Sequence, residues 1–165
     1  MTYKNLLAAL GLMVLSLSLQ AQSRSRTGRF AIQSPASYPL SWEGRWTRVN
    51  DSMYFIHFTA HIRDGWHIYS RHQPGTGLGD ATSIHFDGPA QAGLRGSASE
   101  HGTLIRDTVA ALGVVNFQYE KQVEFTQCWV SPSHSPGPLE GSVHFQVCTP
   151  QTCFPPTDAR FRITW

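Results

Sequence analysis

Apolar and polar residues alternate along much of the chain. The clearest run covers residues 54–63, where apolar side chains fill every second position: Tyr54, Ile56, Phe58, Ala60 and Ile62. A two-residue period over this length predicts a β-strand with one buried face. Asp64-Gly65 then marks a turn, and residues 66–69 begin another strand.

Further strands are expected at 84–86, 114–119, 122–128, 143–148 and 159–165. Glu120-Lys121 would turn a hairpin, whereas the glycines of residues 71–80 predict a loop, and residues 107–113 would hold one helical turn at most. About seven or eight short strands separated by turns predict an all-β fold of the sandwich type. Its core would include the aromatic residues Trp42, Trp46, Phe58, Phe125 and Phe161.

The N-terminal residues have the layout of a secretory signal peptide. Lys4 gives a short positive region, residues 6–19 form an uncharged apolar run, and Ala21 supplies a small residue for cleavage. The run is short for a transmembrane span, which needs roughly 20 apolar residues, and an uncleaved anchor is the alternative. We therefore expect a leader at 1–21, a flexible arm at 22–39 and one domain at 40–165, outside the cytoplasm.

The charge balance does not suggest a nucleic-acid partner. The chain has 13 Lys and Arg against 11 Asp and Glu, for a formal net charge of +2, with no concentrated basic patch. The sequence has no P-loop, no GxGxxG, no C-x-x-C-H haem motif and no G-x-S-x-G elbow. We expect no nucleic-acid partner, no small-molecule substrate, no bound cofactor and no metal.

The candidate chemistry lies in the cysteines, Cys128, Cys148 and Cys153. In an oxidising compartment nearby cysteines usually pair. Cys148 would close the strand at 143–148, and Cys153 would begin the return strand, so that the two face each other at a separation that a disulfide accepts. Closing so short a loop stabilises a fold by roughly 2 kcal/mol, against nearly 5 for a loop of about 100 residues. The bridge would be a weak staple, and both a redox role and a structural role stay open.

The cysteine segment resembles a known family. Residues 141–148, Gly-Ser-Val-His-Phe-Gln-Val-Cys, followed by Cys153-Phe-Pro-Pro, are similar to the end of the periplasmic N-terminal domain of DsbD, the thiol:disulfide interchange protein. Residues 62–69, Ile-Arg-Asp-Gly-Trp-His-Ile-Tyr, and residues 86–89, Phe-Asp-Gly-Pro, are similar to two further segments of that family. The resemblance covers about residues 40–165.

The resemblance implies an immunoglobulin-like β-sandwich in the periplasm, with its active cysteines in a hairpin at one end. It implies a protein-disulfide reductase type of exchange, in which a membrane-embedded thiol donor with a thioredoxin-like domain reduces the pair. The pair would then reduce periplasmic thioredoxin-fold proteins. Cys153 would form the mixed disulfide with partners and Cys148 would resolve it. Phe154 and Pro155 would shape a contact surface with few backbone donors.

Two features depart from the family pattern. Four residues separate the cysteines, fewer than in the best-known members. The cap loop that covers the family's cysteines would fall near Glu100 and Asp107, without an adjacent acidic pair or an aromatic residue. Tyr69 and Trp66 are candidates for that shielding, and His67 and His72, which flank Tyr69, could border the site. Because the sequence ends at Trp165, we expect the donor to be a separate protein.

Two other functions stay open. The domain could be an envelope binding module with a structural disulfide, which would have a reduction potential below about −300 mV. Alternatively, reduced Cys128, Cys148 and Cys153, with His144 or His134, could bind Cu(I) or Zn(II), although this is a weak ligand set. Cys128 itself is expected to be a buried or half-buried free thiol, with intermolecular pairing or a third redox role as the alternative.

Overall fold

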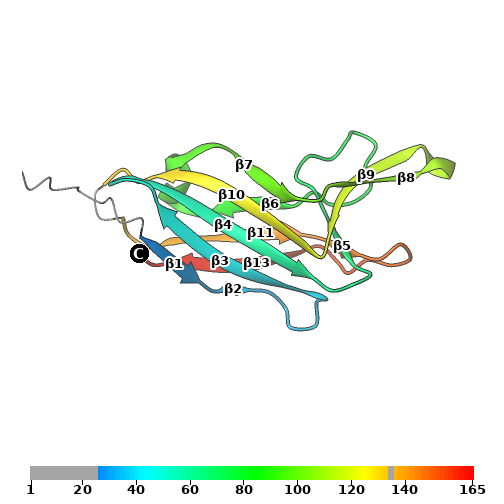
Figure 1. Cartoon of the computed structure of the whole chain (residues 1–165), viewed down its shortest axis with the longest axis horizontal. Coiled ribbons are helices and arrows are strands. Elements are labelled where there is room, and N and C mark those ends of the chain that lie inside the picture. The colour runs from blue at the N-terminus through cyan, green and yellow to red at the C-terminus, as the bar shows by residue number, and fades with distance from the viewer. Residues whose placement is uncertain (1–25, 134–135) are drawn as a thin grey trace, which may run out of the picture.

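The computed structural model describes residues 26–133 and 136–165, and this part of the chain consists mainly of strands. Two antiparallel sheets pack face to face, and a smaller third sheet continues the molecule at one end (Figure 1). The predicted leader at 1–21 lies outside the described residues. Within them, no helix is both long enough and apolar enough to cross a membrane.

The first sheet has five antiparallel strands in the order β1-β3-β4-β10-β7. They are β1 (Thr27–Phe30), β3 (Leu40–Arg48), β4 (Met53–Ile62), β10 (Gln122–Val130) and β7 (Leu94–Gly102). The strands predicted at 54–63 and 122–128 are therefore confirmed as β4 and β10. They pair with each other along their whole length, from Gln122 opposite His61 to Val130 opposite Met53.

The second sheet has the order β2-β13-β11-β6. Its strands are β2 (Ile32–Gln33), β13 (Thr157–Ile163), β11 (Leu139–Phe145) and β6 (Ser83–Phe86). Its aromatic side chains meet those of the first sheet in the core, where the Phe58 ring lies 5.0 Å from Phe161 and 6.4 Å from Phe86. The predicted core aromatics are all buried. The predicted all-β, immunoglobulin-like β-sandwich is confirmed.

The third sheet has the order β12-β5-β9-β8. It consists of β12 (Val147–Cys148), β5 (His67–Tyr69), β9 (Val114–Glu120) and β8 (Ile105–Val109). β8 and β9 reach beyond the sandwich, at the same end as the turn that follows β12 (Figure 1). Two short 3-10 helices complete the described part: η1 (Gly88–Gly93) and η2 (Ala110–Leu112).

The segment predicted as a flexible arm, 22–39, differs from expectation. From Thr27 onward it contributes β1 to the first sheet and β2 to the second. Phe30 explains why, because its ring covers Gly44, where a Cβ would overlap the ring, and lies 5.7 Å from the Phe58 ring. Strand pairing and the packing of Phe30 together hold residues 27–33 of this segment in the fold.

The predicted helical turn at 107–113 is confirmed only in its second half. β8 continues to Val109, and the 3-10 turn of η2 follows. Gly113 then ends the turn with φ 65°, a left-handed conformation that glycine adopts without steric cost.

Candidate functional site

A disulfide joins Cys148 and Cys153 across a tight turn at the end of the third sheet. The two residues form an antiparallel bridge. On either side of it, the Thr149 amide donates to the Thr152 carbonyl over 2.7 Å, and the Phe154 amide donates to the Val147 carbonyl over 2.9 Å. The predicted hairpin between the cysteines is therefore confirmed.

Thr149 fixes the turn between the two cysteines. Its hydroxyl oxygen accepts hydrogen bonds from the backbone amides of Gln151 and Thr152, at 3.2 and 3.1 Å. Such a side-chain-to-backbone turn holds the chain reversal without a longer loop. The disulfide therefore sits on a rigid, short connection.

The two sulfur-bearing residues differ sharply in exposure. Cys148 has a relative accessible surface of 0%, whereas Cys153 is exposed. The difference follows from their positions, since Cys148 ends a strand that pairs with β5, whereas Cys153 lies on the outer edge of the same sheet. An attacking thiolate must approach a disulfide sulfur directly, so only Cys153 is open to a protein partner.

Phe154 lies between two aromatic rings beside the disulfide. Its ring centroid is 4.8 Å from that of Tyr38 and 5.3 Å from that of Trp66. The Tyr38 hydroxyl also donates a 2.9 Å hydrogen bond to the carbonyl of Pro155, which is exposed. The structure thus brings Phe154, Pro155 and Trp66 together next to Cys153. Tyr38, which sequence reasoning missed, comes from the segment predicted as a flexible arm.

Tyr69 lies on β5 under the loop of residues 71–80. A Cβ on Gly79 would overlap the Tyr69 ring, and the Leu78 amide donates to the Asn116 side chain over 3.0 Å. Burial, together with the charge of Asp107, raises the pKa of Tyr69. This loop, rather than the region near Glu100, therefore covers the Tyr69 side of the third sheet.

Glu100 has a structural role where the resemblance places a cap loop. It lies in β7, and its carboxylate accepts hydrogen bonds from the Ser70 hydroxyl at 2.7 Å, the Tyr119 hydroxyl at 3.0 Å and the Arg71 amide. Burial is the main reason that the pKa of Tyr119 is raised to about 12, and the Glu100 charge and hydrogen bond add to it. Glu100 therefore ties the end of β5 to the first sheet.

His67 occupies the position directly opposite Cys148 on the neighbouring strand. Its other neighbour across the sheet is Glu120 on β9. Burial lowers the pKa of His67, against the opposing effects of the Glu120 and Asp107 carboxylates. The sequence placed His67 only at the border of the site, because strand register is not visible in the residues alone.

The third cysteine is separate from the disulfide. Cys128 is a half-buried free thiol in β10 of the first sheet, which confirms the favoured expectation. His144, one of the two histidines considered as a metal ligand, contacts Asp158, with 2.9 Å between Nδ1 and Oδ1. The other, His134, lies outside the described residues. Residues 26–133 and 136–165 contain no group of three or more His, Cys, Asp or Glu that could hold a metal ion.

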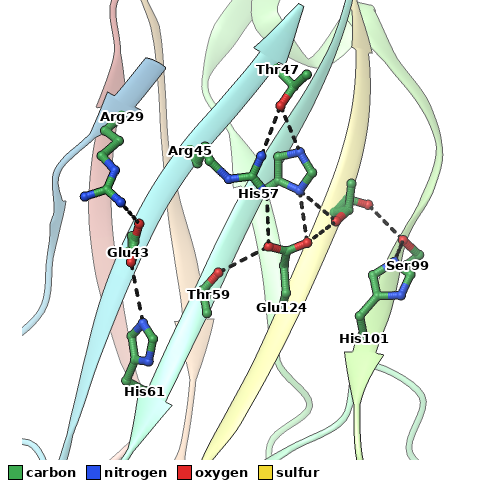
Figure 2. Close-up of polar contacts among 11 residues, drawn as sticks. Arg29, Glu43, Arg45, Thr47, His57, Thr59, His61, Ser99, His101 and Glu124 are labelled. Carbon is green, nitrogen blue, oxygen red and sulfur yellow. Dashed lines mark hydrogen bonds and ion pairs between the residues drawn. The ribbon is translucent and has the colours of Figure 1, made fainter. Parts of the chain in front are cut away.

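A polar cluster occupies one face of the first sheet, on β3, β4 and β10 (Figure 2). Glu124 is its centre and lies 3.1 Å from Nδ1 of His57 and 3.4 Å from the Arg45 guanidinium. The hydroxyls of Thr59 and Thr126 donate to the same carboxylate, at 3.4 and 3.2 Å. The cluster satisfies its own charges and belongs to a different sheet from the disulfide, so it belongs to the scaffold rather than to the site around the disulfide.

The family model "Thiol:disulfide interchange protein DsbD, N-terminal" matches residues 46–164. Among solved structures, the N-terminal periplasmic domain of ScsB from Proteus mirabilis is 18% identical, with a TM-score of 0.56 over 84% of this chain and 51% of that chain. The reduced DsbD N-terminal domain from Neisseria meningitidis is also 18% identical, with a TM-score of 0.49 over 75% of this chain and 85% of that chain. The search of curated proteins gave no match.

The chain is a β-sandwich with a disulfide at the edge of its third sheet, one cysteine exposed and the other buried, and it matches the model of a thiol:disulfide interchange domain. Because the matched residues make up most of the sequence, the chain belongs to the DsbD N-terminal domain family. The resemblance read from the cysteine segment is thereby confirmed.

Proposed function

We propose that the domain exchanges thiols and disulfides with thioredoxin-fold proteins through Cys153, with Cys148 as the resolving cysteine. The observation that carries the assignment is the contrast between an exposed Cys153 and a fully buried Cys148. Family membership supports the class of reaction. One further solved structure is a complex between the DsbD N-terminal domain and the PilB N-terminal domain from Neisseria meningitidis. The match to it has 17% sequence identity and a TM-score of 0.49, and it covers 79% of this chain and 86% of the matched chain.

The exchange has two steps, reduction of the cysteine pair by a donor and reduction of an acceptor by the pair, and electrons balance in each. A donor thiolate attacks the Cys153 sulfur and the Cys148 thiolate leaves; the donor's second thiol then frees the reduced pair. In the second half the Cys153 thiolate attacks the disulfide of an acceptor and forms a mixed disulfide. Cys148 then attacks the Cys153 sulfur, so that the acceptor leaves reduced and the Cys148–Cys153 bond is restored. Two electrons pass from donor to acceptor.

The cellular setting is part of the proposal. The donor is a membrane-embedded protein with a thioredoxin-like domain, and the acceptors are periplasmic thioredoxin-fold proteins. Residues 1–21 are removed as a signal peptide, so that the mature chain begins at Gln22. The mass of the protein recovered from the periplasm of an expressing bacterium tests this point, and a chain that keeps residues 1–21 would contradict it.

Trapping separates the roles of the two cysteines. A Cys148→Ala variant is expected to form a lasting mixed disulfide with a thioredoxin variant that keeps only its attacking cysteine, activated as a mixed disulfide with an aromatic thiol. Cys153 displaces the aromatic thiolate, and neither protein then has a second thiol at the site to resolve the product. A Cys153→Ala variant should trap nothing at this site, since Cys148, the thiol of the pair that remains, is buried. Cys128→Ala is the matched control and should behave like the wild type, given that Cys128 lies on another sheet. Adducts in the Cys153→Ala variant would overturn the assignment.

The native disulfide must also be reducible by a protein. Incubation with a reduced thioredoxin should convert Cys148 and Cys153 to thiols, as measured by alkylation and mass spectrometry. A bond that resists such a protein would have the low potential of a structural bridge. That result would favour an envelope binding module over a redox domain.

A further inference from the structure

Four side chains lie in one row across the third sheet. Glu120 on β9 is opposite His67 on β5, His67 is opposite Cys148 on β12, and Cys148 is opposite Cys153. Directly opposed residues of antiparallel strands point to the same face, with Cβ atoms about 4.5–5.5 Å apart. The row therefore places a carboxylate, an imidazole and two sulfurs side by side.

The residues next to the row along the strands confirm which face it occupies. Ile68 and Val147 alternate with His67 and Cys148, and both belong to the main hydrophobic core. The row therefore lies on the opposite face of the sheet, where His67 is only 7% exposed. Within the described part of the chain, no hydrogen bond engages the His67 ring, which leaves its nitrogens available to a thiol.

We propose that His67 takes the proton from the Cys148 thiol as this thiol resolves the mixed disulfide on Cys153, and that Glu120 supports the charged imidazole. The inference rests on the proposed function, since it concerns the second half of the exchange. Its chemical reason is that a thiol must ionise to attack, whereas burial in apolar surroundings disfavours the thiolate. A base beside a buried thiol, itself paired with a carboxylate, is a common way to activate a nucleophile.

The proposed step balances in protons and electrons. The Cys148 S–H bond gives its proton to an unprotonated nitrogen of His67, and the sulfur's electron pair forms the bond to the Cys153 sulfur. The bond between Cys153 and the partner sulfur breaks, and the partner leaves as a thiolate that takes a proton from the imidazolium or from water. The cysteine pair is oxidised by two electrons, and the partner disulfide is reduced by the same two.

The charged and titratable groups around His67 suit this role. Glu120 and Asp107, from β9 and β8, raise its pKa, while burial, the largest effect, lowers it. Tyr69, on the same strand, holds the ring edge to face with centroids 5.3 Å apart. Because burial dominates, the imidazole is neutral at neutral pH and is ready to accept a proton.

An aromatic disulfide reagent, dithiobis(nitrobenzoate), resolves the two thiols in time. All proteins in this assay carry Cys128→Ala, so that the third, half-buried thiol releases no colour. With chemically reduced protein, Cys153 attacks first and releases one coloured thiolate; Cys148 then displaces the second. In the wild type, the rate of the second phase should rise with pH through an inflection below pH 6.5, as the imidazole loses its proton. In the His67→Gln variant we expect a second phase slower by about tenfold or more at neutral pH, without that inflection. The first phase should change little.

His61→Gln is the matched control. His61 also lies beside a glutamate, with Nε2 3.7 Å from Glu43, but on the first sheet and with 46% of its side chain exposed. Its second phase should match the wild type. Glu120→Gln, a change at an exposed residue, should move the inflection to lower pH because it removes a carboxylate that raises the pKa of His67.

Equal second-phase rates and pH profiles for His67→Gln and His61→Gln would overturn the proposal. If His67→Gln does not fold, an unshifted inflection in Glu120→Gln is equally decisive against it. The assay starts from chemically reduced protein and uses no biological partner. Failure of the proposed function would instead appear as a native disulfide that thioredoxin does not reduce, so the two failures are distinct.

Discussion

The hydroxyl of Tyr38 donates a 2.9 Å hydrogen bond to the carbonyl of Pro155, and so connects the N-terminal segment to the residues that lead from the disulfide to β13. The same tyrosine ring packs on Phe154, with centroids 4.8 Å apart. The redox hairpin is thus held from outside by a residue 117 positions away in the sequence. Both contacts fall on the two residues that directly follow the exposed Cys153.

Two variants of Tyr38 should destabilise the domain to different extents, because they remove different contacts. Tyr38→Phe loses only an exposed hydrogen bond, for an expected cost of about 0.5 kcal/mol. Tyr38→Ala also loses the ring contacts with Phe154 and Phe145, for an expected cost of about 2 kcal/mol, since the ring is half-buried. Urea unfolding of the oxidised proteins measures both differences, and equal stability of the two variants would contradict a role for the ring.

Alkaline pH should destabilise the domain through Tyr119. Its pKa is raised from 10.0 to about 12, first by burial and then by Glu100, so the folded state keeps the proton that the unfolded chain releases. The stabilisation is complete below pH 10 and is lost as pH rises through about 12. Absorbance of the tyrosinate reports the titration. In Glu100→Gln we expect the pKa of Tyr119 to fall only part of the way toward 10, because burial remains. An unchanged pKa would contradict the contribution of Glu100.

The strands that could be predicted from sequence are those with alternating large side chains. β4 and the β9–β10 hairpin follow that pattern, and the turn falls at Lys121, as expected, with φ 61°. β3 escaped prediction because its alternation is interrupted at Gly44, where Phe30 fills the place of a side chain. β7 escaped because it is an edge strand in which Ala98 is the buried apolar residue.

The cysteine hairpin of the site could be predicted from the sequence, but the residues that surround it could not. The cysteine hairpin follows from local spacing and a turn, so Cys148 and Cys153 could be paired in advance. The proximity of His67 and Tyr38 depends on strand register and on packing between segments far apart in sequence. The difference in exposure between the two cysteines likewise arises from the third sheet, which no local pattern specifies.

Reduction of the disulfide should lower the unfolding free energy by only about 2 kcal/mol. The cysteines are five positions apart, and closing so short a loop removes little entropy from the unfolded chain. Urea unfolding with and without a reductant measures the difference, and Cys128→Ala under both conditions controls for the free thiol. A loss above about 4 kcal/mol would mean that the bridge is mainly structural.

Mild acid should weaken the fold through His57 and Glu124. Burial is the main reason that the pKa of His57 lies below 6.5. The unfolded chain therefore takes up a proton more readily, and stability falls as pH drops from 6.5 toward the folded value. Burial alone would raise the pKa of Glu124, but the hydrogen bond and charge of His57, with Thr126 and Arg45, outweigh it and leave this pKa below 4.5. The stabilisation by Glu124 is therefore complete above pH 4.5 and is lost as pH falls through its folded value.

The geometry indicates that a neutral His57 donates through Nδ1 to Glu124, while Nε2 lies 3.5 Å from the Thr47 hydroxyl. A His57→Gln variant keeps a hydrogen-bond donor but cannot take up a proton, so the fall in its unfolding free energy between pH 7 and pH 5 should be smaller than in the wild type. His61→Gln, on the same strand but with a half-exposed side chain, should follow the wild-type curve. Urea unfolding at a series of pH values gives these slopes, and parallel curves for all three proteins would remove His57 as the source of the acid sensitivity.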